Sequence, residues 1–477
     1  MALHDQPEWR EQMRLRFDFN YAMASTIGEE HGLTEQDIGG LTDRIRQGHD
    51  SLRRKRQAGE LAWMELPYAK ESVKEILAYV DSVAGRFDDL VVLGIGGSAL
   101  GITALSTALN PACYNVLPPA RRQGRPRLFV VDNVDPDLFT SVTSLVDLGR
   151  TLFDVITKSG STSETMAQYL IVRKLLVGKL GPGHREHIVA TTDPVAGELR
   201  KLADAEGYRT FSIPPGVGGR FSVLSPVGLL SAAMTGIDVG ALLAGAAYAD
   251  KLCSEPDVWR NPAYMNAAIH YLGYERGRTL SVMMPYAQAL KDVADWFAQL
   301  WAESLGKKHD LDGNVVTIGP TPIKALGVTD QHSQVQLYVE GRFDKIVNFV
   351  AVERFQNEVP IPSGWPDTPE VNYLGGHTLN ELMKVEREGT ALALAEAGRP
   401  SVTFTLPEIN AFTVGQLMFT LEVQTAAIGE LFRINAFDQP GVEAGKIAAY
   451  ALMGRTGYEA RRQEIQAGRK SSPKYVI

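Results

Sequence analysis

The sequence has 477 residues, 44% of them hydrophobic, and a formal net charge of −8. It is therefore long enough for two or three domains with large cores. The acidic balance argues against nucleic acid as the main partner, because proteins that bind phosphate backbones carry a clustered positive excess. The basic run Arg53–Arg56 is the one exception, and we interpret it as the solvated face of a helix.

The number of cysteines and the lengths of the apolar runs indicate what kind of protein this is. Two cysteines cannot form a disulfide framework, and such sparse usage is typical of the reducing cytoplasm, where we expect this protein. The N-terminal residues lack the apolar core of a signal peptide. No stretch approaches the ~20 consecutive apolar residues that span a membrane. The nine histidines show no metal-ligand spacing, so we expect no metal site.

In chain order, residues 1 to about 60 are expected to be helical and polar, with a further helix at about 69–83. Short apolar runs then alternate with helical segments, and strands are expected at 90–93, 128–131, 152–157, 187–191 and 209–213. This alternation predicts a parallel sheet covered by helices on both faces, which binds ligands at the carboxyl ends of its strands. The helix expected at 161–177 presents one stripe, formed by Met166, Tyr169, Leu170, Arg173 and Val177.

A helix-rich connection at about 222–276 precedes a second alternation. Its expected strands are 280–284, 315–318, 346–350 and 402–405, and its expected long helices are 287–305, 379–397 and 408–432. We therefore predict an α/β protein with an N-terminal helical extension (1–65), two layered domains (66–240 and 241–445) and a C-terminal helix and tail (446–477).

A glycine-rich turn follows the first expected strand. Gly94, Gly96 and Gly97 are followed by Ser98 and a helical segment. Glycines allow the backbone to approach a ligand closely, and a helix N-terminus favours a phosphate. A tight turn with small residues for packing explains this stretch equally well.

A second turn, 157–165, follows the third expected strand and is crowded with hydroxyl side chains. Ser and Thr are ordinary N-caps, but four hydroxyls in six residues exceed what capping requires. Because phosphates bind many converging donors, we favour a phosphate loop formed around Thr157, Lys158, Ser159 and Thr162.

Four further candidates carry charge or titrate near neutral pH. Arg220 lies between glycines and a hydroxyl, and Glu303 shares a helix face with Gln299. His332 could move protons, and Lys446 lies near a helix start, where lysine is disfavoured. Each of these residues alone is explained as well or better by a surface position.

Two sequence runs that contain or adjoin several of these residues resemble the signatures of a known family. The run 429–446, GELFRINAFDQPGVEAGK, resembles the C-terminal signature of the glucose-6-phosphate isomerase (phosphoglucose isomerase) family, and the run 217–228 resembles its other signature. Pro215 stands where that family usually has an acidic or small polar residue, and the turn 157–165 and the segment 303–307 also depart in detail from the commonest forms.

The resemblance implies two sugar-isomerase-type (SIS) domains, each a parallel sheet flanked by helices. It implies reversible isomerisation of glucose 6-phosphate and fructose 6-phosphate, in glycolysis and gluconeogenesis, without a cofactor. Glu303 would move a proton between the second and first carbons, Arg220 would stabilise the enediolate, and His332 and Lys446 would assist ring opening. The sugar phosphate and its hydroxyls would be held by Gly97, Ser98, Thr157, Lys158, Ser159, Thr162, Gln299 and Gln439. A homodimer is implied, with His332 donated across its interface.

Three alternatives remain open at this stage. A related isomerase, such as one acting on both glucose and mannose 6-phosphates, would need the same residues. A non-catalytic sugar-phosphate sensor would have no need of Glu303, His332 and Lys446 together. A dinucleotide-binding enzyme would use the first glycine turn, but its glycine spacing is wrong for the usual fingerprint.

Overall fold

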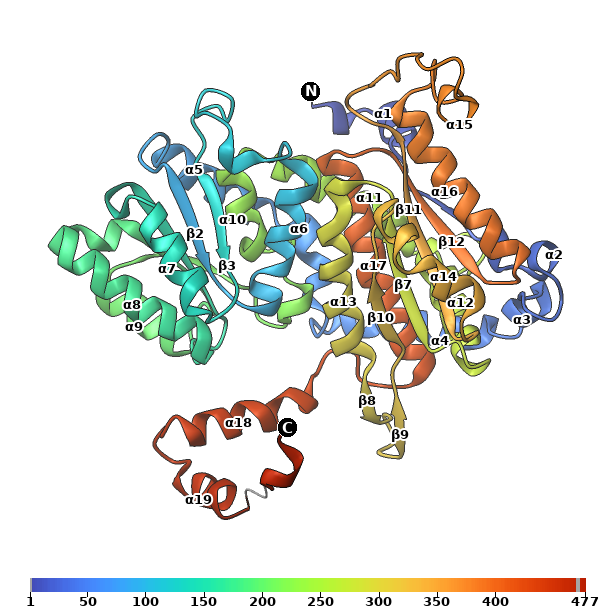
Figure 1. Cartoon of the computed structure of the whole chain (residues 1–477). Helices are drawn as coiled ribbons and strands as arrows, with labels where there is room; N and C mark the ends of the chain where they lie inside the picture. The colour runs from blue at the N-terminus through green and yellow to red at the C-terminus, as the bar shows by residue number, and fades with distance from the viewer. Residues whose placement is uncertain (1, 469–471) are drawn as a thin grey trace.

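The computed structural model describes residues 2–468 and 472–477. It contains two five-stranded sheets, each covered by helices, with α6, α13 and α17 between them (Figure 1). The α/β prediction, with parallel sheets flanked by helices, is confirmed.

The first sheet is entirely parallel, in the order β3-β2-β4-β5-β6. Every residue of β2, β4 and β5 is buried, which explains the continuous apolar runs in the sequence. All five strands lie within two residues of their predicted positions: β2 (Asp89–Leu93), β3 (Arg127–Val131), β4 (Thr151–Ile156), β5 (Ile188–Thr192) and β6 (Arg209–Ser212).

Helices cover both faces of this sheet: α5 (Lys70–Ser82), α6 (Leu100–Leu109) and α10 (Pro226–Met234) on one, α7 (Pro136–Leu145), α8 (Ser163–Leu180) and α9 (Glu198–Glu206) on the other. The expected stripe on α8 is wrong in part. Tyr169 is buried, but Leu170 is 61% exposed, and the buried side is completed by Val172 and Leu176. Apolar residues lie on two adjacent faces of α8, so the sequence is compatible with burial of either face. The face that packs against the sheet is the one with Val172 and Leu176.

The second sheet has the order β1-β12-β11-β7-β10. Its parallel strands are β7 (Leu280–Pro285), β10 (Thr321–Lys324), β11 (Lys345–Arg354) and β12 (Ser401–Glu408). The edge strand β1 (Arg16–Asp18) runs antiparallel to β12, so the N-terminal extension is not wholly helical. The strand expected at 315–318 exists as β9 (Val315–Ile318), but it pairs with β8 (Lys307–His309) in a separate hairpin, and β10 takes its place in the sheet.

Helix α17 (Ala411–Phe432) is buried along almost its whole length. It lies against α11 (Val239–Cys253) at a distance that only glycine permits, because a Cβ on Gly245 would be 1.9 Å from the carbonyl oxygen of Phe412. Further helices packed in this half of the molecule are α12 (Pro262–Glu275), α13 (Lys291–Leu305), α14 (Val335–Glu340) and α16 (Leu379–Glu396).

The N-terminal helices α1 (Pro7–Gln12), α2 (Ala24–Ile27), α3 (Glu35–Gly39) and α4 (Thr42–Gln57) pack on this second half. Two members of the basic run on α4 form ion pairs with the body. Arg56 donates to Asp250 at 2.8 Å, and Lys55 pairs with Glu430. The run therefore anchors α4 as well as facing solvent.

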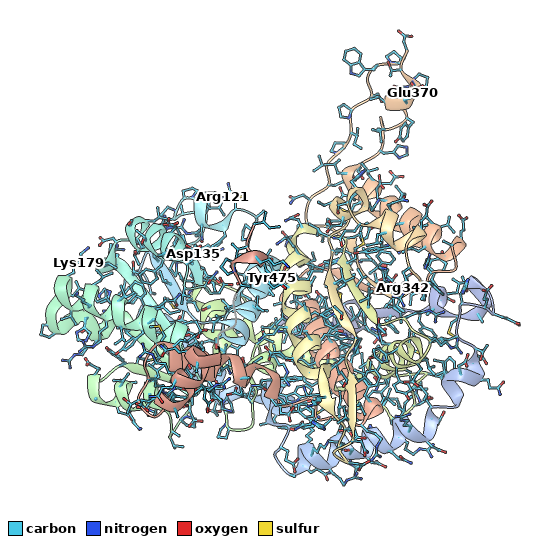
Figure 2. All side chains as sticks on the ribbon, turned by 60° about the horizontal axis from the view of Figure 1, so that its bottom comes forward. Arg121, Asp135, Lys179, Arg342, Glu370 and Tyr475 are labelled. Carbon is cyan, nitrogen blue, oxygen red and sulfur yellow. The ribbon has the colours of Figure 1, made fainter. Side chains whose placement is uncertain are left out.

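Two segments extend from the body. The loop between β11 and α16, which carries α15 (Pro369–Asn372), projects outward with Glu370 near its tip (Figure 2). Helices α18 (Glu443–Leu452) and α19 (Glu459–Gly468) stand away from both sheets, at the bottom of the view in Figure 1. Within the described residues, every helix is too short or too polar to cross a membrane.

Candidate active site

The two expected phosphate loops begin side by side. Strands β2 and β4 are neighbours, with Leu93 paired to Val155, and the strand order changes direction between them. The turns 94–98 and 157–162 follow the carboxyl ends of these two strands. This is the position at which open α/β sheets bind ligands.

The first loop contacts the segments that carry Arg220 and Gln299. A Cβ on Gly97 would be 2.2 Å from the carbonyl oxygen of Gly219, and a Cβ on Gly96 would be 2.9 Å from Gln299 Nε2. Gly96 also has a φ of +57°, which favours glycine. The glycines therefore allow close backbone approach, and Ser98 lies half-buried at the end of the turn.

The second loop is held by its own hydroxyls. Thr157 Oγ1 lies 3.0 Å from Thr162 Oγ1 and accepts a hydrogen bond from Gly160 N at 3.2 Å. Lys158 Nζ donates to the carbonyl oxygen of Val217 at 2.9 Å, while Ser159 is exposed. Thr162 is the N-cap residue of α8 but its side chain does not cap the helix. The first N–H groups of α8 are therefore not bonded by that hydroxyl.

Arg220 joins three parts of the site. Its side chain is 2% exposed. It donates from Nε to Ser304 Oγ at 2.7 Å, from Nη1 to Gln439 Oε1 at 3.0 Å and from Nη2 to the Ala436 carbonyl at 2.6 Å. Burial lowers the pKa of the guanidinium from its ordinary value, and the carboxylates of Glu303 and Asp438 oppose that effect.

Glu303 lies in the last turn of α13 with its carboxylate directed at this arginine. Its Oε2 is 3.5 Å from Arg220 Nη1, and its Oε1 accepts from Gln299 Nε2 at 3.0 Å. The side chain is 30% exposed, so the carboxylate is both fixed and accessible. The Gln299 Oε1 atom is buried and has no hydrogen-bond partner among the described residues.

Lys446 is carried on α18, away from this group. Its Nζ pairs with Glu443 Oε1 at 2.9 Å, and the described residues show no bond from it to Arg220 or Glu303. One turn later, the Tyr450 hydroxyl donates to the carbonyl oxygen of Ser161 at 3.2 Å. Since residues four apart share a helix face, Lys446 lies on the face of α18 that contacts the second loop.

His332 also lies apart from the pair formed by Arg220 and Glu303. It is exposed on the short 3₁₀ turn Thr329–His332. The adjacent Gln331 accepts from the Tyr286 hydroxyl at 2.6 Å and donates to Glu386 at 2.9 Å. In the described parts of the chain, no hydrogen bond or ion pair links His332 to Glu303 or Arg220.

Three contributors to the site were not assigned from the sequence: Ser304, Lys307 and Asp438. Ser304 and Asp438 accept hydrogen bonds from Arg220, the latter through its main chain, and Lys307 contacts both Glu303 and Asp438. The available signal was Gly306, which ends α13, followed by a lysine four residues after Glu303. A lysine at that spacing can donate to a carbonyl group in the last turn of α13, as Lys307 does to Glu303.

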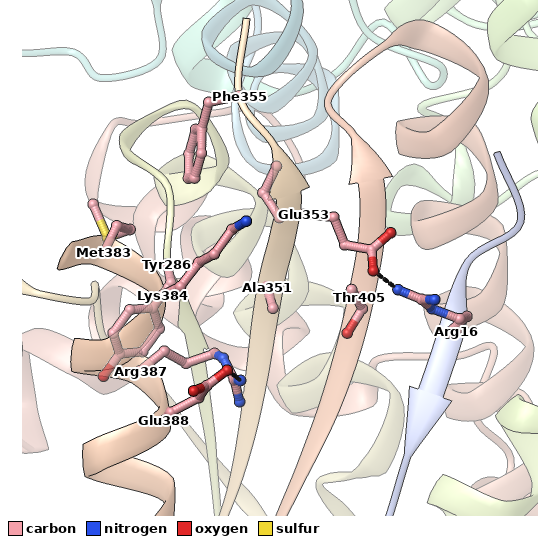
Figure 3. Close-up of a pocket in the computed structure, with 11 residues that line it drawn as sticks. Arg16, Tyr286, Ala351, Glu353, Phe355, Met383, Lys384, Arg387, Glu388 and Thr405 are labelled. Atoms are coloured by element: carbon pink, nitrogen blue, oxygen red, sulfur yellow. Dashed lines mark hydrogen bonds and ion pairs between the residues drawn. The ribbon is translucent and has the colours of Figure 1, made fainter. Parts of the chain in front are cut away.

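A cavity of about 270 Å³ lies elsewhere, between the second sheet and α16 (Figure 3). None of the predicted site residues lines it. Two of its cations are already paired, Arg16 with Glu353 and Arg387 with Glu388. Over residues 2–468 and 472–477, no group of three His, Cys, Asp or Glu residues is placed to hold a metal ion.

Comparison with known proteins agrees with this architecture. Residues 70–472 match the model of the phosphoglucose isomerase family. The glucose-6-phosphate isomerase of Carboxydothermus hydrogenoformans is 50% identical, over 98% of this chain and 100% of its own length. That of Rubrobacter xylanophilus is 45% identical, over 93% of this chain and 100% of its own length.

Solved structures give the same result. A hypothetical protein from Thermus thermophilus superposes with a TM-score of 0.82 at 38% identity, covering 92% of this chain and 100% of that one. A glucose-6-phosphate isomerase from Chlamydia trachomatis gives 0.70 at 25% identity, covering 84% and 77%. The resemblance noted in the sequence is thus confirmed, and this chain belongs to the phosphoglucose isomerase family.

Proposed function

We propose that this chain interconverts glucose 6-phosphate and fructose 6-phosphate, the aldose–ketose isomerisation shared by glycolysis and gluconeogenesis. The observation that carries the proposal is the pair formed by Glu303 and Arg220, 3.5 Å apart, beside two loops suited to a phosphate. A carboxylate facing two adjacent carbons and a cation facing their oxygens are sufficient for this proton transfer. Membership of the family supports the same reaction.

The two loops are proposed to hold the phosphate. Backbone N–H groups around Gly97 and at the start of α8, together with the hydroxyls of Ser98, Ser159 and Thr162, supply the donors that a phosphate needs. Thr157 and Lys158 shape the second loop through their bonds to Thr162 and Val217. Gln299 bonds to Glu303 and Gln439 bonds to Arg220, and these two amides are proposed to bind sugar hydroxyls.

Chemistry follows in two stages. His332 and Lys446 assist ring opening by moving a proton between the ring oxygen and the first hydroxyl. Glu303 then takes the proton from the second carbon and returns it to the first. Arg220 stabilises the negative enediolate between these steps, because a buried cation acts strongly in a site of low dielectric.

The test is the E303Q variant, assayed with fructose 6-phosphate and a coupled dehydrogenase that detects glucose 6-phosphate. Loss of the general base is expected to lower kcat by at least ~10²-fold, with little change in KM. D295N neutralises another carboxylate on α13, one that pairs with Lys324, and is expected to retain activity. Near-normal turnover of E303Q would remove Glu303 from its role, and mannose 6-phosphate assayed in parallel measures substrate breadth.

We also propose that the active form is a homodimer in which His332 completes the site of the partner copy. The support is that His332 is exposed and, within the described residues, has no hydrogen bond or ion pair with Glu303 or Arg220 of its own chain. Mixing H332A and E303Q chains tests this, because a heterodimer would then contain one intact site. Recovered activity is expected. If His332 acts within its own chain, both sites are defective and mixing recovers nothing.

A further inference from the structure

Lys307 is a second buried cation at the site, and it bonds to main chain. It is the first residue of β8, and its side chain is 5% exposed. Its Nζ donates to the carbonyl oxygen of Glu303 at 2.6 Å and to that of Asp438 at 3.0 Å. It also lies 3.6 Å from Asp438 Oδ1. These three oxygen atoms belong to Glu303, at the end of α13, and to Asp438, which follows α17. Arg220 donates hydrogen bonds to the same two segments.

Those two carbonyls come from different parts of the chain. One is at the end of α13, which carries Glu303 and Gln299. The other is in the linker 435–442, which carries Gln439 and leads to α18 with Lys446. Arg220 Nη2 donates to the same Asp438 carbonyl at 3.1 Å. Two cations therefore converge on one oxygen, and only Arg220 also bonds the Glu303 carboxylate.

The charges around Lys307 are balanced. Burial lowers its pKa to about 8, and Arg220 acts in the same direction, whereas Asp438 and Glu303 favour the charged form. Protonated Lys307 brings the group to two cations and two carboxylates. Deprotonation leaves the bonds to the two carbonyls without their charge assistance, which weakens them.

We propose that Lys307 is a positioning residue whose ammonium clamps the end of α13 to the linker 435–442, and so fixes Glu303 and Gln439 around Arg220. This inference rests on the proposed function. It predicts an effect on kcat, because a displacement of about 1 Å at a reacting group costs about 10²-fold in rate. Among the described residues, Lys307 bonds to Glu303 and Asp438 and to neither of the loops proposed to hold phosphate, so KM is expected to change little.

The first experiment compares K307M with K308M in the full-length protein. Methionine keeps an unbranched stem but cannot donate to either carbonyl, and Lys308 is the exposed neighbour on the same strand. For K307M we expect kcat to fall about 10²-fold and backbone amides of the linker 435–442 to exchange faster with deuterium. K308M should change neither. Full kcat or unchanged exchange in K307M would overturn the clamp.

The second experiment uses K307R, which keeps the charge and remains informative if K307M does not fold. Arginine stays protonated across the accessible pH range and can donate to both carbonyls. The wild type is expected to lose kcat as the pH rises through about 8, and K307R to hold its kcat to higher pH. An alkaline limb at the same pH in both proteins would refute the role of Lys307.

The two proposals fail separately. Full turnover in E303Q would refute the general-base role of Glu303, and a wild-type protein that forms no glucose 6-phosphate from fructose 6-phosphate would refute the proposed function. Linker exchange in K307M is measured without substrate, so it tests the clamp whatever E303Q shows.

Discussion

The substitution R220K keeps a positive charge at the site but removes the forked guanidinium. In the structure that guanidinium donates to five acceptors: Ser304 Oγ, Glu303 Oε2, Gln439 Oε1 and the carbonyl oxygens of Ala436 and Asp438. A lysine ammonium has three N–H donors at one point. At least two of the five acceptors must therefore lose their bond.

Both stability and turnover should respond. Hydrogen bonds to charged groups contribute about 1.5–3 kcal/mol each, so two lost bonds lower the free energy of unfolding by at least about 3 kcal/mol. Losing a preorganised donor to a developing oxyanion typically costs about 10²–10³-fold in kcat. The two loops proposed to hold the phosphate keep their own contacts, so KM should change less than kcat.

Urea unfolding and the coupled assay with fructose 6-phosphate measure these two effects, and R46K, on an exposed arginine of α4, is the matched control. A rise in KM at unchanged kcat would reassign Arg220 to holding substrate. An unchanged free energy of unfolding would refute the bond count.

Two further substitutions test the loop and the core. G97A places a Cβ 2.2 Å from the Gly219 carbonyl oxygen, so the first loop must move away from Arg220 and KM should rise in the coupled assay; G218A, whose Cβ meets nothing within 4 Å, should leave KM unchanged. For D154N, burial raises the pKa of Asp154 from 3.8 to about 7 in the folded chain. The folded protein therefore holds a proton that the unfolded chain releases, and stability falls as pH rises between these values, by about 4 kcal/mol in total. Urea unfolding from pH 4 to 8 should show a larger loss in the wild type than in D154N, because the buried Glu422, whose pKa is also raised, is present in both proteins. Equal pH profiles would refute the role of Asp154.

Strands buried on both faces could be predicted from the sequence. The apolar runs at β2, β4 and β5 have no competing interpretation, so their positions were correct within two residues. The two edge strands of the second sheet could not be found in this way. Strand β10 contains Pro322 and Lys324, and β1 has only three residues, so neither has a buried apolar run. Val315–Ile318 has strong strand propensity, but propensity does not say which strand it pairs with.

Part of the candidate site could also be predicted, because its residues lie in strong local sequence patterns. Motif residues such as Gly97, Arg220 and Glu303 lie next to glycines or on a strongly patterned helix. The structure brings these three into one group. The sequence points to Lys446 because lysine is unfavourable near a helix start, yet Glu443 pairs with it at 2.9 Å and offsets that cost. The position of Lys446 depends on how α18 lies against the rest of the molecule, which no local pattern encodes.

The edge strand β1 has a consequence for the order in which this protein forms. Residues 16–18 are made early on the ribosome, but their partners, residues 403–405, emerge nearly 400 residues later. Until β12 is made, residues 16–18 have no strand to pair with. The outer edge of β12 in turn stays unpaired until residues 16–18 bind to it. Removal of the first eighteen residues would leave a ready template for intermolecular strand pairing, so folding yield, more than activity, is the property that this short strand protects.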